Sequence, residues 1–250
     1  MIDANVKLGH WPYRPARGFD ALLPTMDTHG IARAVVSSLN AVFYLNPQDG
    51  NDEVAAWTKP HRDRLTPLAV LRPNFTGWRD DLARCLDDYG MKGVVLYPNY
   101  HRFELPDPAI EPLMAVMAER RLPVCVQMGL EDPRRQFDRE IVNDVPVEML
   151  KAFVEAYPGV TIVGLGLKQG QPQQISGPLP RNFRFDLSNF EGMGKVEEAV
   201  DLFGADRILF GTNYPLFNTL ANVEKLAKAA IPASARKAIT QTNAEEVFGE

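Results

Sequence analysis

Histidine and cysteine, which often bind transition metals or form disulfides, are scarce in this chain. Its 250 residues include four histidines and two cysteines. Cys85 is at helical spacing from Leu82 and Leu86, and Cys125 lies in the apolar segment Pro123–Val126. We therefore expect two buried thiols with no disulfide between them, and a reducing, cytoplasmic location.

Excess positive charge and long apolar runs are also lacking. The formal net charge is −5, and no basic run occurs, so we expect no nucleic acid partner. No apolar stretch is long enough to span a bilayer, so we expect no membrane partner. A predicted strand begins at residue 2, and we therefore expect no secretory signal.

Short apolar strands alternate with amphipathic helices along the sequence. This order predicts an α/β fold with a parallel sheet, and eight strands in 250 residues favour a single-domain (β/α)8 TIM barrel over residues 1–250. An open doubly wound sheet is the alternative. The predicted strands cover residues 2–8, 34–38, 65–71, 93–97, 123–127, 160–164, 183–187 and 207–210. The predicted helices cover 19–29, 52–62, 78–89, 108–121, 147–157, 195–203, 220–230 and 233–248.

The first strand carries an unusual polar face. Ile2, Ala4, Val6 and Leu8 alternate strictly with Asp3, Asn5 and Lys7, which predicts that the two sets lie on opposite faces. Polar side chains on a strand of a parallel sheet are expected where that face lines a cavity. Two long connections, 128–146 and 166–182, follow strands and should lie at the same carboxyl-terminal end of the barrel.

Several segments together resemble the amidohydrolase superfamily, in particular the amidohydrolase 2 group of small metal-dependent TIM-barrel hydrolases and decarboxylases. The resemblance covers essentially the whole chain and rests on the segments 2–9, 92–98, 122–127, 207–215 and 243–248. It implies a TIM barrel with its site at the carboxyl ends of the strands, and in the family a zinc or other divalent ion held by histidines and an aspartate.

The residues at those ligand positions differ from the family pattern. The His-x-His pair of the first strand is replaced by Asn5 and Lys7, the histidine ending the fifth strand by Gln127, and the aspartate after the eighth strand by Asn213. The histidine after the sixth strand falls near Gly166. An ammonium cannot bind a divalent ion and amides bind it poorly, so we expect no metal cofactor. A metal centre rebuilt from other residues, such as His10 and His101, is the alternative.

If the barrel forms, the strand ends bring a cationic, donor-rich set of side chains to one mouth, suited to a small anionic molecule such as a carboxylate or enolate. We predict catalytic roles for Lys7, Gln127 and Asn213. The predicted substrate-binding residues are Asn5, Arg72, Tyr97, His101, Glu131, Arg134 and Trp11.

Lys7 has three interpretations at this stage. It could stabilise a developing oxyanion as a fixed cation. If it is desolvated, its pKa falls and it could act as a base or as a Schiff-base amine. Alternatively, it pairs with an acid such as Asp3 or Glu131 and only fills the mouth of the barrel.

The first functional hypothesis is therefore an amidohydrolase-like hydrolase that acts without a metal on a small carboxylate-bearing ester, lactone or related acid. A catalytically inactive barrel that binds or senses a small molecule is the alternative, and a decarboxylase or other lyase of the same family is the second. The apolar helix faces are compatible with a homodimer.

Overall fold

The strands of the chain form a ring that closes between the first strand and the last. The computed structural model describes residues 1–13, 19–138 and 141–249. All pairings between named strands are parallel, in the orders β1-β2-β3 and β4-β5-β6-β7-β8-β9. The strands are β1 (Ile2–Leu8), β2 (Arg33–Ser38), β3 (Leu65–Pro67), β4 (Ala69–Leu71), β5 (Val94–Leu96), β6 (Val124–Gln127), β7 (Ile162–Leu165), β8 (Phe183–Asp186) and β9 (Ile208–Leu209).

Backbone hydrogen bonds join the two sheets into one barrel. The amide of Ala4 donates to the carbonyl of Phe210 at 2.8 Å, and the amide of Lys7 donates to the carbonyl of Tyr214 at 2.8 Å. β3 and β4 are halves of one strand interrupted at Leu68, whose amide donates to β2. Across the described residues the ring therefore contains eight strands, which confirms the predicted barrel and excludes the open sheet.

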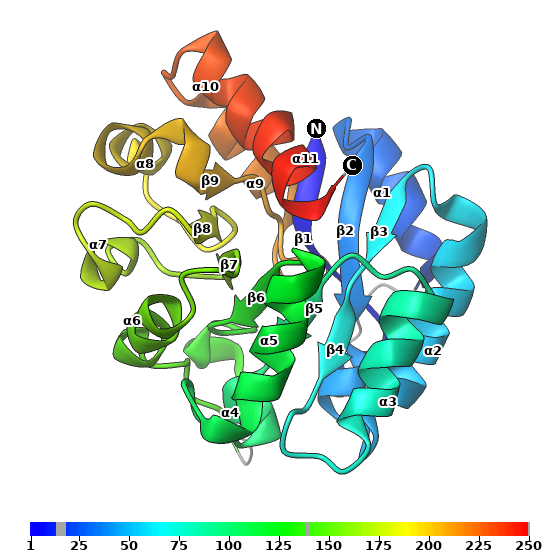
Figure 1. Ribbon diagram of the computed structural model, residues 1–250. Helices are drawn as coiled ribbons and strands as arrows, with labels where there is room; N and C mark the ends of the chain where they lie inside the picture. The colour runs from blue at the N-terminus through cyan, green and yellow to red at the C-terminus, as the bar shows by residue number, and fades with distance from the viewer. Residues whose placement is uncertain (14–18, 139–140, 250) are drawn as a thin grey trace.

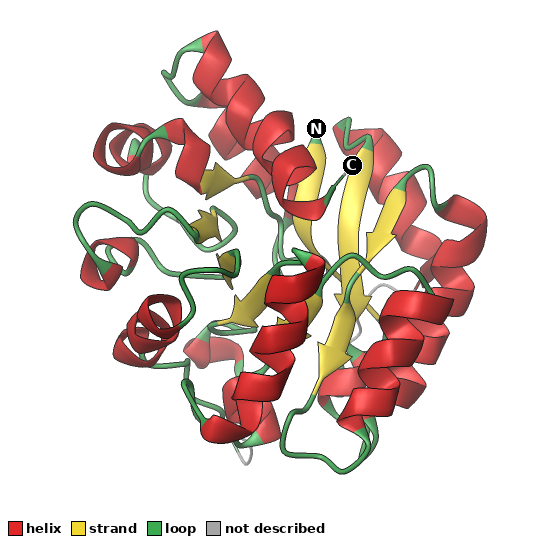
Figure 2. Cartoon of the chain, in the orientation of Figure 1, coloured by secondary structure: helices red, strands yellow, loops and turns green. Residues whose placement is uncertain are grey.

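Helices surround the strands (Figures 1 and 2). None of those in the described part of the chain is long and apolar enough to cross a membrane. The helices are α1 (Leu22–His29), α2 (Pro47–Thr58), α3 (Trp78–Ala83), α4 (Pro98–His101), α5 (Glu111–Arg120), α6 (Val147–Ala156), α7 (Pro172–Ile175), α8 (Lys195–Phe203), α9 (Thr219–Lys228), α10 (Ala233–Lys237) and α11 (Asn243–Phe248).

Two differences from the predicted helices have local causes. α2 begins at Pro47, earlier than expected, because the side chain of Asn46 accepts from the amide of Gln48 at 3.1 Å and caps the helix, with proline in the first turn. The segment 166–182, predicted to lack a helix, contains the single turn of α7.

Two apolar layers lie on either side of the barrel wall. The outer layer joins strand residues to the helices, and the inner layer contains Val35, Val70, Val95 and Cys125. Both cysteines are buried and free, as expected.

The prediction of strict alternation in β1 is wrong. Ile2 and Ala4 belong to the inner layer, whereas Val6 and Leu8 belong to the outer layer. The pairing register with β2 shifts between Asp3 and Val6. The carboxylate of Asp3 accepts from the amide of Asn5 at 3.1 Å, so a side chain takes up a backbone donor where the strand is irregular.

Candidate functional site

Lys7 occupies the interior of the barrel near the carboxyl end of β1. Its side chain is 1% exposed, and its ammonium donates to the side-chain oxygen of Asn5. Burial lowers the pKa of Lys7 to about 8, and the negative charges of Asp186 and Asp3 partly oppose that shift. A substantial fraction of this side chain is therefore uncharged at mildly alkaline pH.

Asn5 is held in one orientation by its neighbours. Its Nδ2 donates to Oδ2 of Asp186 at 3.0 Å and to Oγ of Ser188 at 3.4 Å. Because the carboxylate can only accept, the side-chain oxygen of Asn5 must face Lys7. Asn5 therefore presents a hydrogen-bond acceptor to the amine of Lys7.

Asp186 ends β8 and is completely buried. Its Oδ1 accepts from the amide of Gly166 at 2.6 Å, and its Oδ2 accepts from Asn5 and from the amide of Ser188 at 3.3 Å. Gly211 allows this packing, because a Cβ there would lie 2.2 Å from Oδ2 of Asp186. We did not predict a role for Asp186, which is the single acid of the short strand β8.

The second buried carboxylate belongs to Asp3 of β1, and it contacts the segment after β9. Oδ1 accepts from the amide of Thr212 at 3.0 Å as well as from Asn5, and Oδ2 accepts from the hydroxyl of Thr212 at 2.5 Å. Burial raises the pKa of Asp3 to about 7, and these hydrogen bonds limit the rise. Asp3 therefore changes its protonation near neutral pH.

Gln127 and Asn213 complete the polar interior. Nε2 of Gln127 donates to the carbonyl of Gly129 at 2.6 Å, and Nδ2 of Asn213 donates to the carbonyl of Leu130 at 3.2 Å. Carbonyl oxygens only accept, so both amide groups are fixed with their oxygens directed elsewhere. Within the described residues, Oε1 of Gln127 and Oδ1 of Asn213 are buried and have no hydrogen-bond partner.

These contacts connect the polar side chains into one cluster. A Cβ on Gly166 would lie 2.8 Å from Nε2 of Gln127, and the amide of Gly166 already binds Asp186. The segment that contains Gly129 and Leu130 links Gln127 to Asn213. We call this set the polar cluster, and its members are Asp3, Asn5, Lys7, Gln127, Asp186, Ser188, Thr212 and Asn213.

The remaining predicted site residues fall into two groups. Trp11 and Tyr97 are each 1% exposed and belong to the inner apolar layer. Burial raises the pKa of Tyr97, so its phenol stays protonated. Glu131 is also buried and directly follows Leu130. These three lie in positions compatible with the predicted barrel mouth.

Arg72, His101 and Arg134 are not in the polar cluster, contrary to the expectation of a single shared pocket. Arg72 and His101 line a separate cavity of about 1070 Å³. Burial lowers the pKa of His101 to about 4, so its ring is neutral. The side chain of Arg134 is 81% exposed and pairs with its neighbour Asp132, because a two-residue separation within one turn favours local pairing over reach into the barrel.

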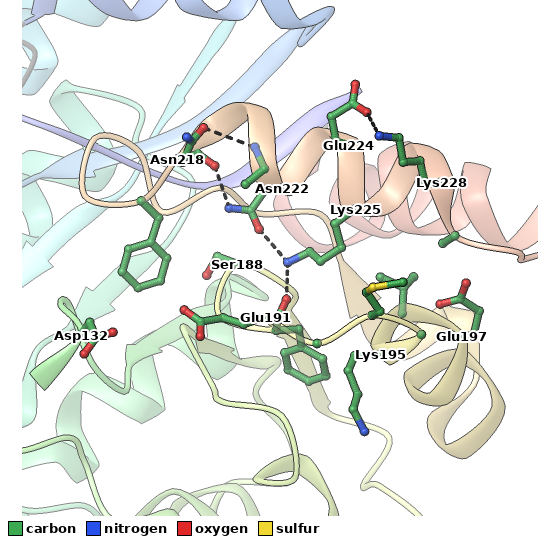
Figure 3. Close-up of a pocket in the computed structure, with 18 of the residues that line it drawn as sticks. Asp132, Ser188, Glu191, Lys195, Glu197, Asn218, Asn222, Glu224, Lys225 and Lys228 are labelled. Carbon is green, nitrogen blue, oxygen red and sulfur yellow. Dashed lines mark hydrogen bonds and ion pairs between the residues drawn. The ribbon is translucent and has the colours of Figure 1, made fainter. Parts of the chain in front are cut away.

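A cavity of about 630 Å³ adjoins the polar cluster (Figure 3). Among the described residues that line this cavity, Ser188 is the one member of the polar cluster, and it also contacts Asn5. Its apolar lining includes Phe190, Leu216 and Phe217.

One wall of this cavity is held in place by Lys225 of α9. Its ammonium donates to the carbonyls of Leu187 and Phe190 at 2.6 and 2.9 Å and to the side-chain oxygen of Asn222 at 2.7 Å. Burial lowers the pKa of Lys225 to about 8. The two bonds to Leu187 and Phe190 fix the loop that carries Ser188.

A match to a known protein family shows to which family this chain belongs. The model of the family described as "Amidohydrolase" matches residues 4–165 and 174–249. The chain belongs to the amidohydrolase family. No curated protein sequence matches this family member.

Solved structures of similar fold include several decarboxylases. This amidohydrolase-family chain is similar to 5-carboxyvanillate decarboxylase LigW from Sphingomonas paucimobilis, with 14% identity, a TM-score of 0.79 and coverage of 99% of this chain and 98% of that one. It is also similar to 2,6-dihydroxybenzoate decarboxylase from Rhizobium, with 18% identity, a TM-score of 0.70 and coverage of 99% and 98%.

A third structure is that of dihydroxybenzoic acid decarboxylase from Polaromonas sp. JS666 with bound manganese and the inhibitor 2-nitroresorcinol. The identity is 16%, the TM-score 0.74 and the coverage 99% of this chain and 96% of that one. At these identities the likeness establishes the shared barrel fold.

The polar cluster of this amidohydrolase-family chain does not fit a divalent ion. The described residues contain no group of three or more His, Cys, Asp and Glu side chains placed to hold one. The carboxylates of Asp3 and Asp186 each accept three hydrogen bonds, and Lys7 adds a positive charge beside them. A divalent ion would have to displace these donors and approach an ammonium.

Proposed function

We propose that this amidohydrolase-family chain decarboxylates a small carboxylic acid without a catalytic divalent ion, using Lys7 in place of the ion. Decarboxylation leaves an electron pair on carbon, and it needs a nearby positive charge to stabilise that pair and a proton to quench it. A buried ammonium supplies both. The observation that supports this role is the enclosed amine of Lys7, held by Asn5 beside Asp186.

The carboxylates of the polar cluster favour decarboxylation over hydrolysis of an ester or lactone. Hydrolysis requires a base that accepts a proton from water. Asp186 and Asp3 are each engaged by three hydrogen bonds from backbone or side-chain donors, and His101 lines a different cavity. The similarity of fold to solved decarboxylases agrees with this choice.

The neighbouring cavity offers space for a substrate. Its volume of about 630 Å³ suits a small organic molecule, and its apolar side chains can contact the body of such a molecule. Ser188 links this cavity to Asn5 and so to Lys7. The orphaned oxygens of Gln127 and Asn213 can accept hydrogen bonds from a bound acid or its hydroxyl groups.

The test is release of carbon dioxide from a panel of aromatic and 3-oxo carboxylic acids by purified protein treated with a chelator. Lys7→Met should abolish release. The control is Lys92→Met, because Lys92 is exposed and precedes β5, at the opposite end of the barrel; its activity should be unchanged. Circular dichroism checks that both variants fold.

Two results would contradict the proposal. One is hydrolysis of esters or lactones with no release of carbon dioxide from any acid, which would restore the hydrolase hypothesis. The other is saturable binding of an acid with no turnover at all, which would show that the barrel only binds its ligand.

A further inference from the structure

Within the described residues, the amine of Lys7 makes one hydrogen bond, to the side-chain oxygen of Asn5. Asn5 is oriented by Asp186 and Ser188 so that its oxygen faces Lys7. In the uncharged amine, one N–H bond can donate to that oxygen, which directs the lone pair elsewhere. In the described residues, no ion pair within 4.0 Å occupies the Lys7 ammonium, unlike Lys168, Lys195 and Lys228.

The surroundings of this amine also suit bond formation to carbon. Cys125 and the inner apolar layer enclose the same interior, and desolvation makes an amine a better nucleophile. With a pKa of about 8, about a quarter of Lys7 is uncharged at a pH near 7.5, against about one thousandth for an ordinary lysine. The buried oxygens of Gln127 and Asn213 lack donors within the described residues and can accept from a new hydroxyl group.

We propose that Lys7 acts as a Schiff-base nucleophile and that the acids decarboxylated by this chain are 3-oxo acids. This inference rests on the decarboxylase function proposed above. It names the substrate class. An imine at the ketone carbon can accept the electrons of the breaking bond to the carboxylate when one carbon lies between the ketone carbon and the carboxylate carbon, as in a 3-oxo acid.

The reaction balances with water and one proton. The lone pair of Nζ attacks the ketone carbon, and the proton that the nitrogen then loses passes to the carbonyl oxygen to give a carbinolamine. The hydroxyl group then leaves as water after taking a second proton, and the iminium forms. The bond to the carboxylate breaks, carbon dioxide leaves, and the electron pair forms an enamine.

Regeneration of the free amine of Lys7 requires only water. The enamine carbon takes a proton from water, and a water molecule then hydrolyses the iminium, which releases the ketone and restores the amine. The net reaction converts one 3-oxo carboxylate and one proton into a ketone and carbon dioxide. Asn5 keeps its N–H contact with Lys7 at each stage, because the amine, the carbinolamine and the iminium formed from an oxo acid all carry at least one N–H.

Borohydride trapping tests the covalent step. The full-length protein is incubated with acetoacetate, 3-oxopentanedioate or benzoylacetate and reduced with sodium borohydride, and intact mass and peptide mapping follow. With acetoacetate, we expect Lys7 to gain an isopropyl group. Reduction without an oxo acid measures the background on surface lysines, and the Lys92→Met variant should be trapped as the wild type is.

A second variant separates the covalent role from a purely electrostatic one. Lys7→Arg keeps a positive charge and removes the nucleophilic amine, so release of carbon dioxide should fall to the rate in buffer. An oxygen isotope provides a readout that needs no variant. In water enriched in oxygen-18, a product ketone formed through an imine must carry the heavy isotope from its first appearance, faster than exchange in buffer.

The outcomes distinguish this inference from the function on which it rests. Release of carbon dioxide with no adduct on Lys7 and with the original ketone oxygen retained overturns the Schiff base and leaves metal-free decarboxylation standing. Full activity in Lys7→Arg does the same. Absence of carbon dioxide release from every acid rejects the decarboxylase function, and an adduct that keeps its carboxylate then rejects 3-oxo acids as decarboxylation substrates.

Discussion

The amide nitrogen of Asn5 donates to the carboxylate of Asp186 at 3.0 Å, and this bond joins the first strand of the barrel to the seventh. It fixes which end of the Asn5 amide faces Lys7. The same bond explains why asparagine suits this position, because the buried carboxylate of Asp186 needs a donor there. Substitutions that disturb this bond should change both the stability of the protein and the hydrogen bonding of the Lys7 amine.

Gly211 tests the packing of that bond. A Cβ would lie 2.2 Å from Oδ2 of Asp186 and 3.0 Å from Cβ of Asn5, so Gly211→Ala should destabilise the protein by about 3 kcal/mol. Gly159→Ala is the matched control, because no atom lies within 4 Å of its Cβ position, and it should be neutral or slightly stabilising. Urea unfolding measures both. Equal stability of the two variants would show that Asp186 is not packed against Gly211.

The protonation of Asp3 should make stability depend on pH. Its folded pKa of about 7 is above the ordinary 3.8, so its favourable contribution is complete below about pH 4 and is lost as the pH rises to about 7. Asp3→Asn removes this dependence and can still bind Thr212 through both side-chain atoms. The free energy of unfolding of the variant, relative to that of the wild type, should rise by up to about 4 kcal/mol between pH 4 and pH 8.

Unfolding in urea at several pH values provides the measurement for Asp3. Asp88→Asn is the control, because Asp88 is exposed, and its stability relative to wild type should be constant over that range. If the advantage of Asp3→Asn does not change with pH, Asp3 is already ionised or already neutral throughout.

Lys225 should stabilise the loop that carries Ser188. Lys225→Met removes three hydrogen bonds to Leu187, Phe190 and Asn222, and the free energy of unfolding should fall by about 1 to 3 kcal/mol. On the same helix, Lys228 is exposed and pairs with Glu224, so Lys228→Met should leave the free energy of unfolding essentially unchanged. Hydrogen exchange at residues 187–190 should rise only in the Lys225 variant.

Removal of metal should leave the protein unchanged. Dialysis against a chelator should alter neither the melting temperature nor any release of carbon dioxide, and added manganese or zinc should not raise the melting temperature, because an ion that bound the folded state would stabilise it. Elemental analysis should find far less than one divalent ion per chain. A stoichiometric ion whose removal lowers the melting temperature would refute the conclusion drawn from the polar cluster.

The barrel could be predicted from the sequence because alternation of strands and helices determines it over the whole chain. Local sequence patterns predicted the elements less well where a side chain, and not another backbone group, forms the hydrogen bond to a backbone amide. In β1 the carboxylate of Asp3 binds the amide of Asn5, and the alternation predicted from residues 2–8 is therefore broken. The side chain of Asn46 caps α2, so this helix begins at Pro47 and not at residue 52 as predicted.

The candidate site was predicted in part. Lys7, Asn5, Gln127 and Asn213 come together because they lie in or just after the carboxyl-terminal parts of strands that converge at one end of the barrel. Asp186 was missed, since a single acid in a short strand gives no spacing pattern. The separation of Arg72 from the cluster could not be predicted, because the length of an arginine side chain allows either direction after the strand end.

The backbone bond from Lys7 to Tyr214 has a consequence for biosynthesis. It ties the reactive amine to the contact between the first and the last strand, and this contact can form only after residues far apart in the chain have met. A nascent or proteolytically shortened chain without the segment after β9 would keep an ordinary, hydrated lysine at this position. Amine reactivity would then report completed barrel closure.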